Sequence, residues 1–243
     1  MDTRKLPVLS VGRARDAEVD LGRWPVSIPA VRQVLTEGLE FGALTVLVGE
    51  NGAGKSTLVE AVAQAYGLSP EGGSTGARLT TRASESPLWE SLWLRRGIGA
   101  ARWGFFLRAE TMHGYYTYLE DNPSSSGRGE PHYHEMSHGE SFLEVLSTRF
   151  TGPGLFVLDE PEAALSFTSS LALVGLLAEI ARSDTTQALV ATHSPIVAAT
   201  PGARLLELSD TGIQERSWRE LELVDHWSSF LADPDLYLRH LEP

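Results

Sequence analysis

The hydrophobic pattern along the chain predicts short buried strands separated by amphipathic helices. Residues 44–48 (Leu-Thr-Val-Leu-Val) form an apolar, β-rich run that ends at a glycine, as expected of a buried strand. Residues 56–66 follow with apolar side chains at helical spacing. Two more buried strands are predicted at 155–158 and 188–191, with a helix over 169–182 between them. This strand–helix–strand order indicates parallel strands joined by crossover helices.

Four regions depart from that pattern. Residues 69–76 and 122–131 are rich in Gly, Ser and Pro, and we expect mobile loops there. Residues 204–208 and 213–218 flank an Asp-Thr-Gly turn, which predicts a hairpin of short antiparallel strands. The stretch 219–243 is an amphipathic C-terminal tail rich in Leu, Trp and Tyr. We expect this tail to pack on the body of the protein, with partner binding as the alternative.

The bulk composition narrows the class of protein. The 243 residues are 42% hydrophobic, which suits one α/β domain over residues 1–243 with a sizeable core. Cysteine is absent, and neither a run of about eighteen apolar residues nor a secretory leader is visible, so we expect a cytoplasmic protein without membrane insertion. The formal charge of −12 argues against a broad nucleic-acid face. Any nucleic-acid contact would be local or supplied by a partner.

A glycine-rich loop carries the first chemical signal. Residues 49–56 (Gly-Glu-Asn-Gly-Ala-Gly-Lys-Ser) fit the phosphate-binding pattern G-x-x-x-x-G-K-[ST] and lie between a predicted strand and a predicted helix. Glycines let backbone N–H groups wrap a phosphate, and the helix N-terminus adds positive potential. Lys55 is expected to reach the β- and γ-phosphates, Ser56 to bind Mg²⁺ and Thr57 to touch the α-phosphate. The predicted nucleotide-binding residues of the loop are Glu50, Asn51, Gly52, Ala53, Gly54, Lys55, Ser56 and Thr57.

Two acids at the end of another strand favour ATP hydrolysis over other phosphate chemistry. A phosphate-binding loop alone does not separate kinases, GTPases and ATPases. The predicted strand 155–158 ends in Asp159 and Glu160. An acid at such a strand tip can hold Mg²⁺ directly or through water, which suits Asp159. Glu160 is then in position to polarise an attacking water.

Four motifs in order resemble the ABC-type P-loop ATPases. Besides the loop at 49–56, residues 159–166 (Asp-Glu-Pro-Glu-Ala-Ala-Leu-Ser) resemble the Walker B motif and D-loop of that family. Residues 136–141 (Met-Ser-His-Gly-Glu-Ser) resemble its signature motif, and His193 resembles its switch histidine. The resemblance covers about residues 44–195 and implies the three-layer α/β fold of P-loop NTPases around a mostly parallel sheet.

The same resemblance implies a mechanism. Two copies of the chain would form a head-to-tail homodimer around two ATP molecules, each held between one P-loop and the other copy's signature residues Ser137, Gly139 and Glu140. ATP would close the dimer, and hydrolysis to ADP and phosphate would loosen it. The implied catalytic residues are Lys55, Glu160 and His193, and the implied cofactors are ATP and Mg²⁺.

Several positions depart from the family pattern. His138 replaces the first glycine of the signature, and Ser166 stands where the D-loop usually has aspartate. No glutamine marks a Q-loop; Glu110 is the candidate substitute and a further candidate Mg²⁺ ligand. Arg108 suits either a phosphate or a carboxylate. Trp24 is a candidate for stacking on adenine, with a structural tryptophan as the alternative.

A metal site at His132, His134 and His138 is not expected, because two of them border a Gly/Ser-rich loop and the third belongs to the signature.

Three functional hypotheses remain. The chain also resembles small stand-alone bacterial predicted AAA/SMC-RecF-like ATPases, through residues 105–110, 137–141 and 159–165. Residues 111–136 are too short for the docking subdomain of a transporter ATPase. The first hypothesis is therefore a soluble ATPase switch that gates an unknown protein partner, with DNA repair, mobile-element activity and phage defence as candidate processes. The alternatives are the nucleotide-binding subunit of a transporter and an ATP-dependent adaptor with little turnover.

Overall fold

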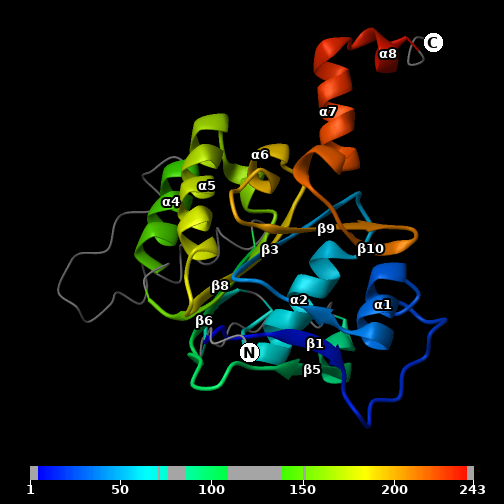
Figure 1. Cartoon of the computed structure of the whole chain (residues 1–243), viewed down its shortest axis with the longest axis vertical. Coiled ribbons are helices and arrows are strands. Elements are labelled where there is room, and N and C mark those ends of the chain that lie inside the picture. Colours follow the sequence, from blue (N-terminus) through cyan, green and yellow to red (C-terminus); the bar gives the residue numbers. More distant parts are fainter. Residues whose placement is uncertain (1–4, 71, 76–85, 109–137, 150–151, 240–243) are drawn as a thin grey trace.

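A parallel sheet forms the centre of the protein. The computed structural model describes residues 5–70, 72–75, 86–108, 138–149 and 152–239. Within these residues, a seven-stranded sheet has the order β10-β9-β3-β8-β7-β6-β4 (Figure 1). Neighbouring strands from β9 to β6 are parallel, and β10 and β4 at the edges are antiparallel to their neighbours, which confirms the predicted sheet. The strands are β3 (Leu44–Gly49), β4 (Gly73–Ser74), β6 (Gly104–Arg108), β7 (Gly154–Asp159), β8 (Thr186–Thr192), β9 (Arg204–Ser209) and β10 (Gly212–Glu215).

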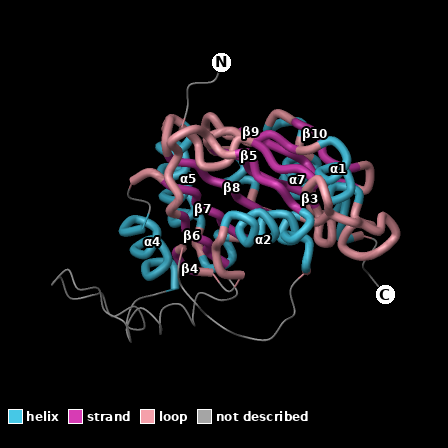
Figure 2. The backbone as a smooth tube through the Cα atoms, turned by 90° about the horizontal axis from the view of Figure 1, so that it is seen from below, coloured by secondary structure: helices cyan, strands magenta, loops and turns pink. Residues whose placement is uncertain are grey.

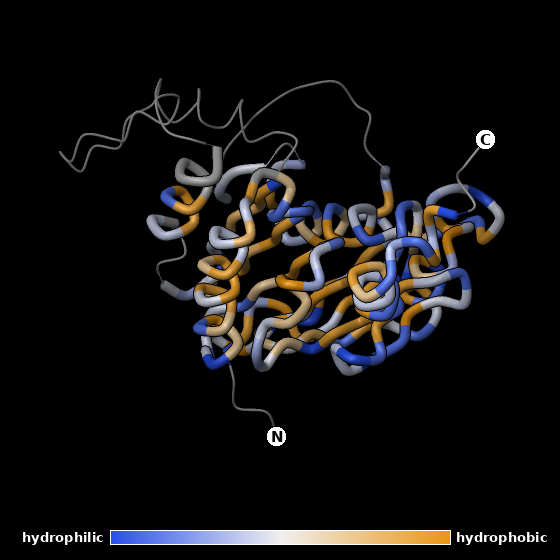
Figure 3. The backbone as a smooth tube through the Cα atoms, turned by 90° about the horizontal axis from the view of Figure 1, so that it is seen from above, coloured by the Kyte–Doolittle hydropathy of each residue, from blue (hydrophilic) through white to orange (hydrophobic). Residues whose placement is uncertain are grey.

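Helices cover both faces of this sheet and complete the three layers. Alternate residues of β3 face opposite cores: Val46 and Val48 pack with α5, whereas Leu47 packs with α2. The strands run through the middle of the fold (Figure 2), and hydrophobic residues are concentrated along them (Figure 3). The helices on one face are α1 (Pro29–Glu37) and α2 (Lys55–Tyr66), and those on the other are α4 (His138–Arg149), α5 (Phe167–Ala181) and α6 (Pro195–Ala198).

A second, antiparallel sheet lies on the α2 side. It has the order β2-β1-β5, with β1 (Ser10–Arg13), β2 (Leu39–Glu40) and β5 (Leu92–Arg95), the last preceded by η1 (Pro87–Ser91). The side chain of Gln187 in β8 ties the segment before β1 to the main sheet: its Oε1 accepts the Val8 N–H at 2.8 Å, and its Nε2 donates to the Val8 carbonyl at 2.6 Å. The hydrophobic pattern did not predict this sheet.

The segment expected to be a loop at 69–76 contains a short strand. Gly73 and Ser74 form β4, which pairs with Phe106 and Phe105 of β6. The hydroxyl of Thr75 accepts the Gly104 N–H at 2.8 Å and so continues the contact. An unpaired sheet edge offers backbone partners to residues of any type, which explains a strand where propensity opposes one. The other predicted loop, 122–131, lies outside the described residues.

The predicted hairpin is confirmed, but its second strand is shorter than expected. β10 ends at Glu215, and the chain then turns into η5 (Trp218–Glu220). Glu220 caps the start of η5, because its Oε2 accepts hydrogen bonds from both the Ser217 N–H and the Ser217 hydroxyl. This cap competes with the strand and ends it before Trp218.

The expectation that the C-terminal tail packs on the body is wrong beyond Val224. The tail forms α7 (Glu222–Ala232) and α8 (Asp235–Leu238), which extend away from the sheet (Figure 1). Leu221 and Val224 are buried, whereas Trp227 is 47% exposed and Leu231 is 73% exposed. Amphipathic spacing predicts an apolar face but not what covers it. Among the described residues, none of the helices combines the length and apolar character that a membrane span requires.

Candidate active site

The phosphate-binding loop joins β3 to α2 through glycines that no other residue could replace without strain. Gly49 has φ of 151°, and a Cβ built there would lie 2.3 Å from the carbonyl oxygen of Leu208. Gly54 has φ of 99°, and its Cβ would lie 2.9 Å from Cγ2 of Ile28. Helix α2 begins at the next residue, so its first N–H groups border the loop. The residues predicted to bind nucleotide, Glu50 to Thr57, therefore form one continuous segment that runs from the loop into the first turn of α2.

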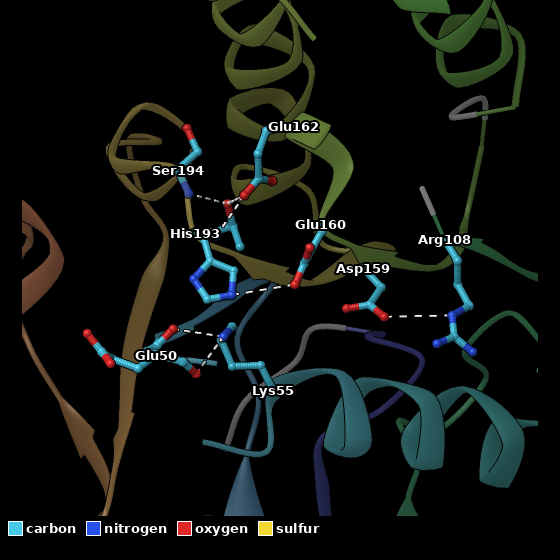
Figure 4. A network of polar contacts seen from close by, with 10 residues as sticks. Glu50, Lys55, Arg108, Asp159, Glu160, Glu162, His193 and Ser194 are labelled. Atoms are coloured by element: carbon cyan, nitrogen blue, oxygen red, sulfur yellow. Dashed lines mark hydrogen bonds and ion pairs between the residues drawn. The ribbon is translucent and has the colours of Figure 1, made fainter. Parts of the chain in front are cut away.

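Lys55 is enclosed by this loop. Only 4% of the residue is exposed, and its Nζ donates to the carbonyl oxygens of Gly49 at 2.7 Å and Glu50 at 3.1 Å (Figure 4). Burial lowers the pKa of Lys55 from its usual 10.5, and the nearby carboxylates oppose that shift. These carboxylates belong to Glu160, Asp159, Glu162 and Glu50.

Asp159 lies at the carboxyl end of β7, beside the end of β6. It is 7% exposed, and its Oδ2 is 3.7 Å from Nε of Arg108. Arg108 also donates from Nη1 to Oε2 of Glu60 on α2 at 3.0 Å. The sequence left open whether Arg108 binds a phosphate or a carboxylate, and in the structure it is paired with the carboxylates of Asp159 and Glu60. Glu110, the candidate Q-loop substitute, lies outside the described residues.

Glu160 turns the chain away from the sheet in an unusual backbone conformation. Among the described residues it is the one non-glycine with positive φ, at φ 50° and ψ 51°. Its N–H still donates to the Ala191 carbonyl at 2.9 Å, while its side chain is 43% exposed. Oε1 of Glu160 is 3.4 Å from Nε2 of His193, which follows the end of β8 (Figure 4). The structure thus brings together the predicted catalytic residues Lys55, Glu160 and His193.

Glu162 belongs to the same cluster, although the sequence did not predict a role for it. It lies in η4 (Pro161–Ala164), and its Oε1 accepts hydrogen bonds from the Thr192 hydroxyl and the His193 N–H, each at 2.6 Å. The one available signal was an acid two residues after Glu160, and that spacing alone does not reveal its partner. Ser166, at the position usually held by aspartate, caps α5 by accepting the Ser169 N–H at 3.2 Å.

The donor set fits Mg²⁺. Ser56 supplies a hydroxyl in the first turn of α2, and Asp159 supplies a buried carboxylate at the neighbouring strand end. Hard oxygen donors in this small number suit Mg²⁺, which takes most of its ligands from phosphates and water. No group of three or more His, Cys, Asp or Glu residues among those described could hold a metal by itself.

The remaining predicted residues are only partly described. Ser137, His132 and His134 lie outside the described residues, and the backbone of α4 begins at His138, so Gly139 and Glu140 are in its first turn. Trp24 is 58% exposed and lies in the segment before α1. Its adenine contact remains a prediction.

A small open pocket connects the P-loop with the base of α7. The sequence did not predict this pocket, because the residues that line it are far apart along the chain. The lining residues are Gly49, Glu50, His193, Glu207, Leu208, Glu222, Leu223 and His226.

Comparisons with known proteins agree with this fold. The family model described as "ABC transporter" matches residues 33–163, more than half of the chain. The ABC transporter G family member STR2 of Medicago truncatula is 27% identical over 194 residues, which are 72% of this chain and 26% of that protein. The chain thus spans about a quarter of the length of this relative.

One solved structure gives a similar result for the fold, and a second match is weaker. An ABC transporter in an inward-facing conformation matches with a TM-score of 0.50 and 15% identity, covering 93% of this chain and 89% of that one. The SMC head domain of Thermotoga maritima matches with a TM-score of 0.45 and 19% identity, covering 74% of this chain and 93% of that one.

Proposed function

The chain belongs to the ABC transporter family and is an ATP-binding and ATP-hydrolysing member of it, and from this premise we propose that a second copy of the chain completes its hydrolytic site. One observation carries the assignment of the chemistry. Lys55, Asp159, Glu160 and His193 meet at the carboxyl ends of the parallel strands, with Glu160 Oε1 3.4 Å from His193 Nε2. This arrangement suits in-line attack of water on a bound γ-phosphate.

Each residue has a role that its surroundings support. The N–H groups of the loop and the enclosed ammonium of Lys55 bind the β- and γ-phosphates. Mg²⁺, when bound, would be held by Ser56 and Asp159 and would offset negative charge on the phosphate oxygens. Glu160 orients the attacking water, and its half-exposed carboxylate is free to accept a hydrogen bond from it. His193 contacts the γ-phosphate.

The layers of the fold support a site shared between two copies. The signature segment leads into α4, which packs beside α5 on the face of the sheet opposite α2 (Figure 1). The P-loop leads into α2 on the other face, so α2 and α4 lie on opposite sides of the sheet. A second copy, arranged head-to-tail, supplies Ser137, Gly139 and Glu140 to the ATP bound by the first.

The test is the mass of the Glu160→Gln variant in solution, measured by light scattering with and without Mg-ATP. We expect ATP to convert monomer to dimer, because binding remains while hydrolysis stops. Lys55→Ala should abolish binding, and Ser137→Arg should bind ATP without dimerising. Hydrolysis by Glu160→Gln at the parental rate would refute the assignment of the carboxylate. Binding without dimerisation in Glu160→Gln would refute the homodimer.

For the biological role we propose an ATPase switch that gates a protein partner, with DNA repair and phage defence as candidate processes. Only residues 109–137 separate β6 from α4, which leaves little chain for a transporter's docking subdomain. The family description and the STR2 relative favour the second candidate, the ATPase subunit of a transporter. Cell fractionation separates the two: a transporter subunit would sediment with membranes and require detergent for release, whereas the switch would remain in the supernatant.

A further inference from the structure

We propose that Glu162 is a positioning residue for ATP hydrolysis, which fixes the switch histidine by holding its backbone rather than its ring. This inference rests on the proposed function. It adds to the nucleotide site a residue that acts through His193.

The geometry centres on a single carboxylate oxygen. Oε1 of Glu162 accepts the Thr192 hydroxyl and the His193 N–H, both at 2.6 Å (Figure 4). The hydroxyl oxygen of Thr192 in turn accepts the Ser194 N–H at 2.9 Å. One carboxylate therefore organises three consecutive residues, with two short bonds of the charge-assisted kind that are about twice as strong as neutral ones.

The pairing of β8 with its two neighbouring strands ends just before His193. β8 pairs with β3 up to Thr192, opposite Val48, and with β7 up to Ala191, opposite Asp159. The N–H of His193 lies past both pairings, so no strand supplies its acceptor. A partly buried backbone donor needs a partner, and the side chain of Glu162 provides it. Without Glu162, the position of His193 would depend on a free strand end.

The same short segment carries the catalytic carboxylate. Glu160 and Glu162 flank Pro161, whose ring restricts the backbone between them. Glu160 approaches the imidazole of His193 at 3.4 Å, while Glu162 holds the backbone of the same histidine. A displacement of η4 would therefore move the water-orienting group and the switch histidine together.

The hydrogen bonds can be separated from the charge by substitution. The second oxygen, Oε2, is buried and has no hydrogen-bond partner among the described residues. The amide oxygen of a glutamine could accept both bonds that Oε1 accepts, so Glu162→Gln keeps the contact and removes the charge. Glu162→Asp keeps the charge but is one methylene too short, and Glu162→Ala removes both.

The experiment compares kcat and KM for Mg-ATP in these variants. We expect kcat to fall about 10- to 100-fold in Glu162→Ala and Glu162→Asp, since misplacing a catalytic group by about 1 Å costs on the order of 100-fold. Glu162→Gln should retain kcat within about 3-fold, and the ATP dissociation constant should change by less than about 3-fold throughout, because the phosphate-binding loop is intact. If Glu162→Ala fails to fold, the comparison of Glu162→Asp with Glu162→Gln still decides the question.

A double-mutant cycle tests the route of the effect. Glu162→Asp should slow the parental chain but cause no further loss in a His193→Ala background, because the residue it positions is gone. Equal losses in both backgrounds would overturn the inference, as would a Glu162→Gln variant as slow as Glu162→Asp. An active parental chain that tolerates Glu162→Ala defeats this inference alone, whereas an inactive parental chain defeats the proposed function with it.

Discussion

Replacing Glu160 with glycine should stabilise the chain while it stops ATP hydrolysis. The backbone of Glu160 is left-handed, at φ 50° and ψ 51°. A residue with a Cβ pays about 1–2 kcal/mol in that conformation. Glycine adopts it freely but loses about 0.5–1 kcal/mol through its more flexible unfolded state. The net gain in the free energy of unfolding is therefore about 0.75 kcal/mol, which raises the melting temperature of a chain of this size by about 1.5–3 °C.

Glu160→Gln is the matched control for that comparison. It removes the same charge beside Lys55 and His193 but keeps the strained backbone. The lost side-chain packing is small, because the Glu160 side chain is 43% exposed. Both variants are compared by thermal unfolding without nucleotide and by ATP turnover. A glycine variant that melts at or below the temperature of the glutamine variant would refute the view that strain is stored at this position.

Three further predictions concern the loop, its lysine and the tail. Gly49→Ala should destabilise the chain by about 2 kcal/mol or more in urea unfolding, because its Cβ would meet the Leu208 carbonyl oxygen at 2.3 Å. Gly52→Ala is the control, because a Cβ there would have nothing within 4 Å and should cost only its backbone strain. Equal losses of unfolding free energy in the two variants would contradict this prediction. Because burial lowers the pKa of Lys55 from 10.5, ATP affinity should fall as the pH rises toward 10.5, and a constant dissociation constant up to that pH would oppose this. Leu231 is 73% exposed, so Leu231→Ser should shift the melting temperature by about 1 °C or less. Val224 is 6% exposed, so Val224→Ser should lower the melting temperature by about 3 °C or more. Equal shifts in the two variants would mean that the tail packs on the body.

The parallel core of the fold was predictable because each strand is buried on both faces. β3, β7 and β8 therefore appear in the sequence as continuous apolar runs, and their boundaries differ from the predicted ones by a few residues at most. Parallel strands also end at one edge of a sheet. Placing Lys55, Asp159, Glu160 and His193 just after such strands was therefore enough to predict that they meet.

Contacts that depend on distant pairs were not predictable. The acceptor for the His193 N–H is a side chain 31 residues away, and the amide of Gln187 binds the backbone of a residue 179 positions away. β4 forms because β6 offers it an edge, not because Gly73 and Ser74 favour strands. A local pattern carries no information about which partner a polar side chain will meet.

The charges around Lys55 explain why the site should bind ATP with Mg²⁺ rather than ATP alone. The carboxylates of Glu160, Asp159, Glu162 and Glu50 surround one enclosed ammonium, and Arg108 is the further cation paired with Asp159. Arg108 is also paired with Glu60, so the negative groups outnumber the positive ones and would repel the phosphates of free ATP at short range. Mg²⁺, held by Ser56 and Asp159, would offset that excess of negative charge. Mg²⁺ is therefore expected to contribute to affinity as well as to hydrolysis. The acidic cluster expected to lower the affinity for free nucleotide includes Glu160, which we propose orients the attacking water, and Glu162, which holds the backbone of His193.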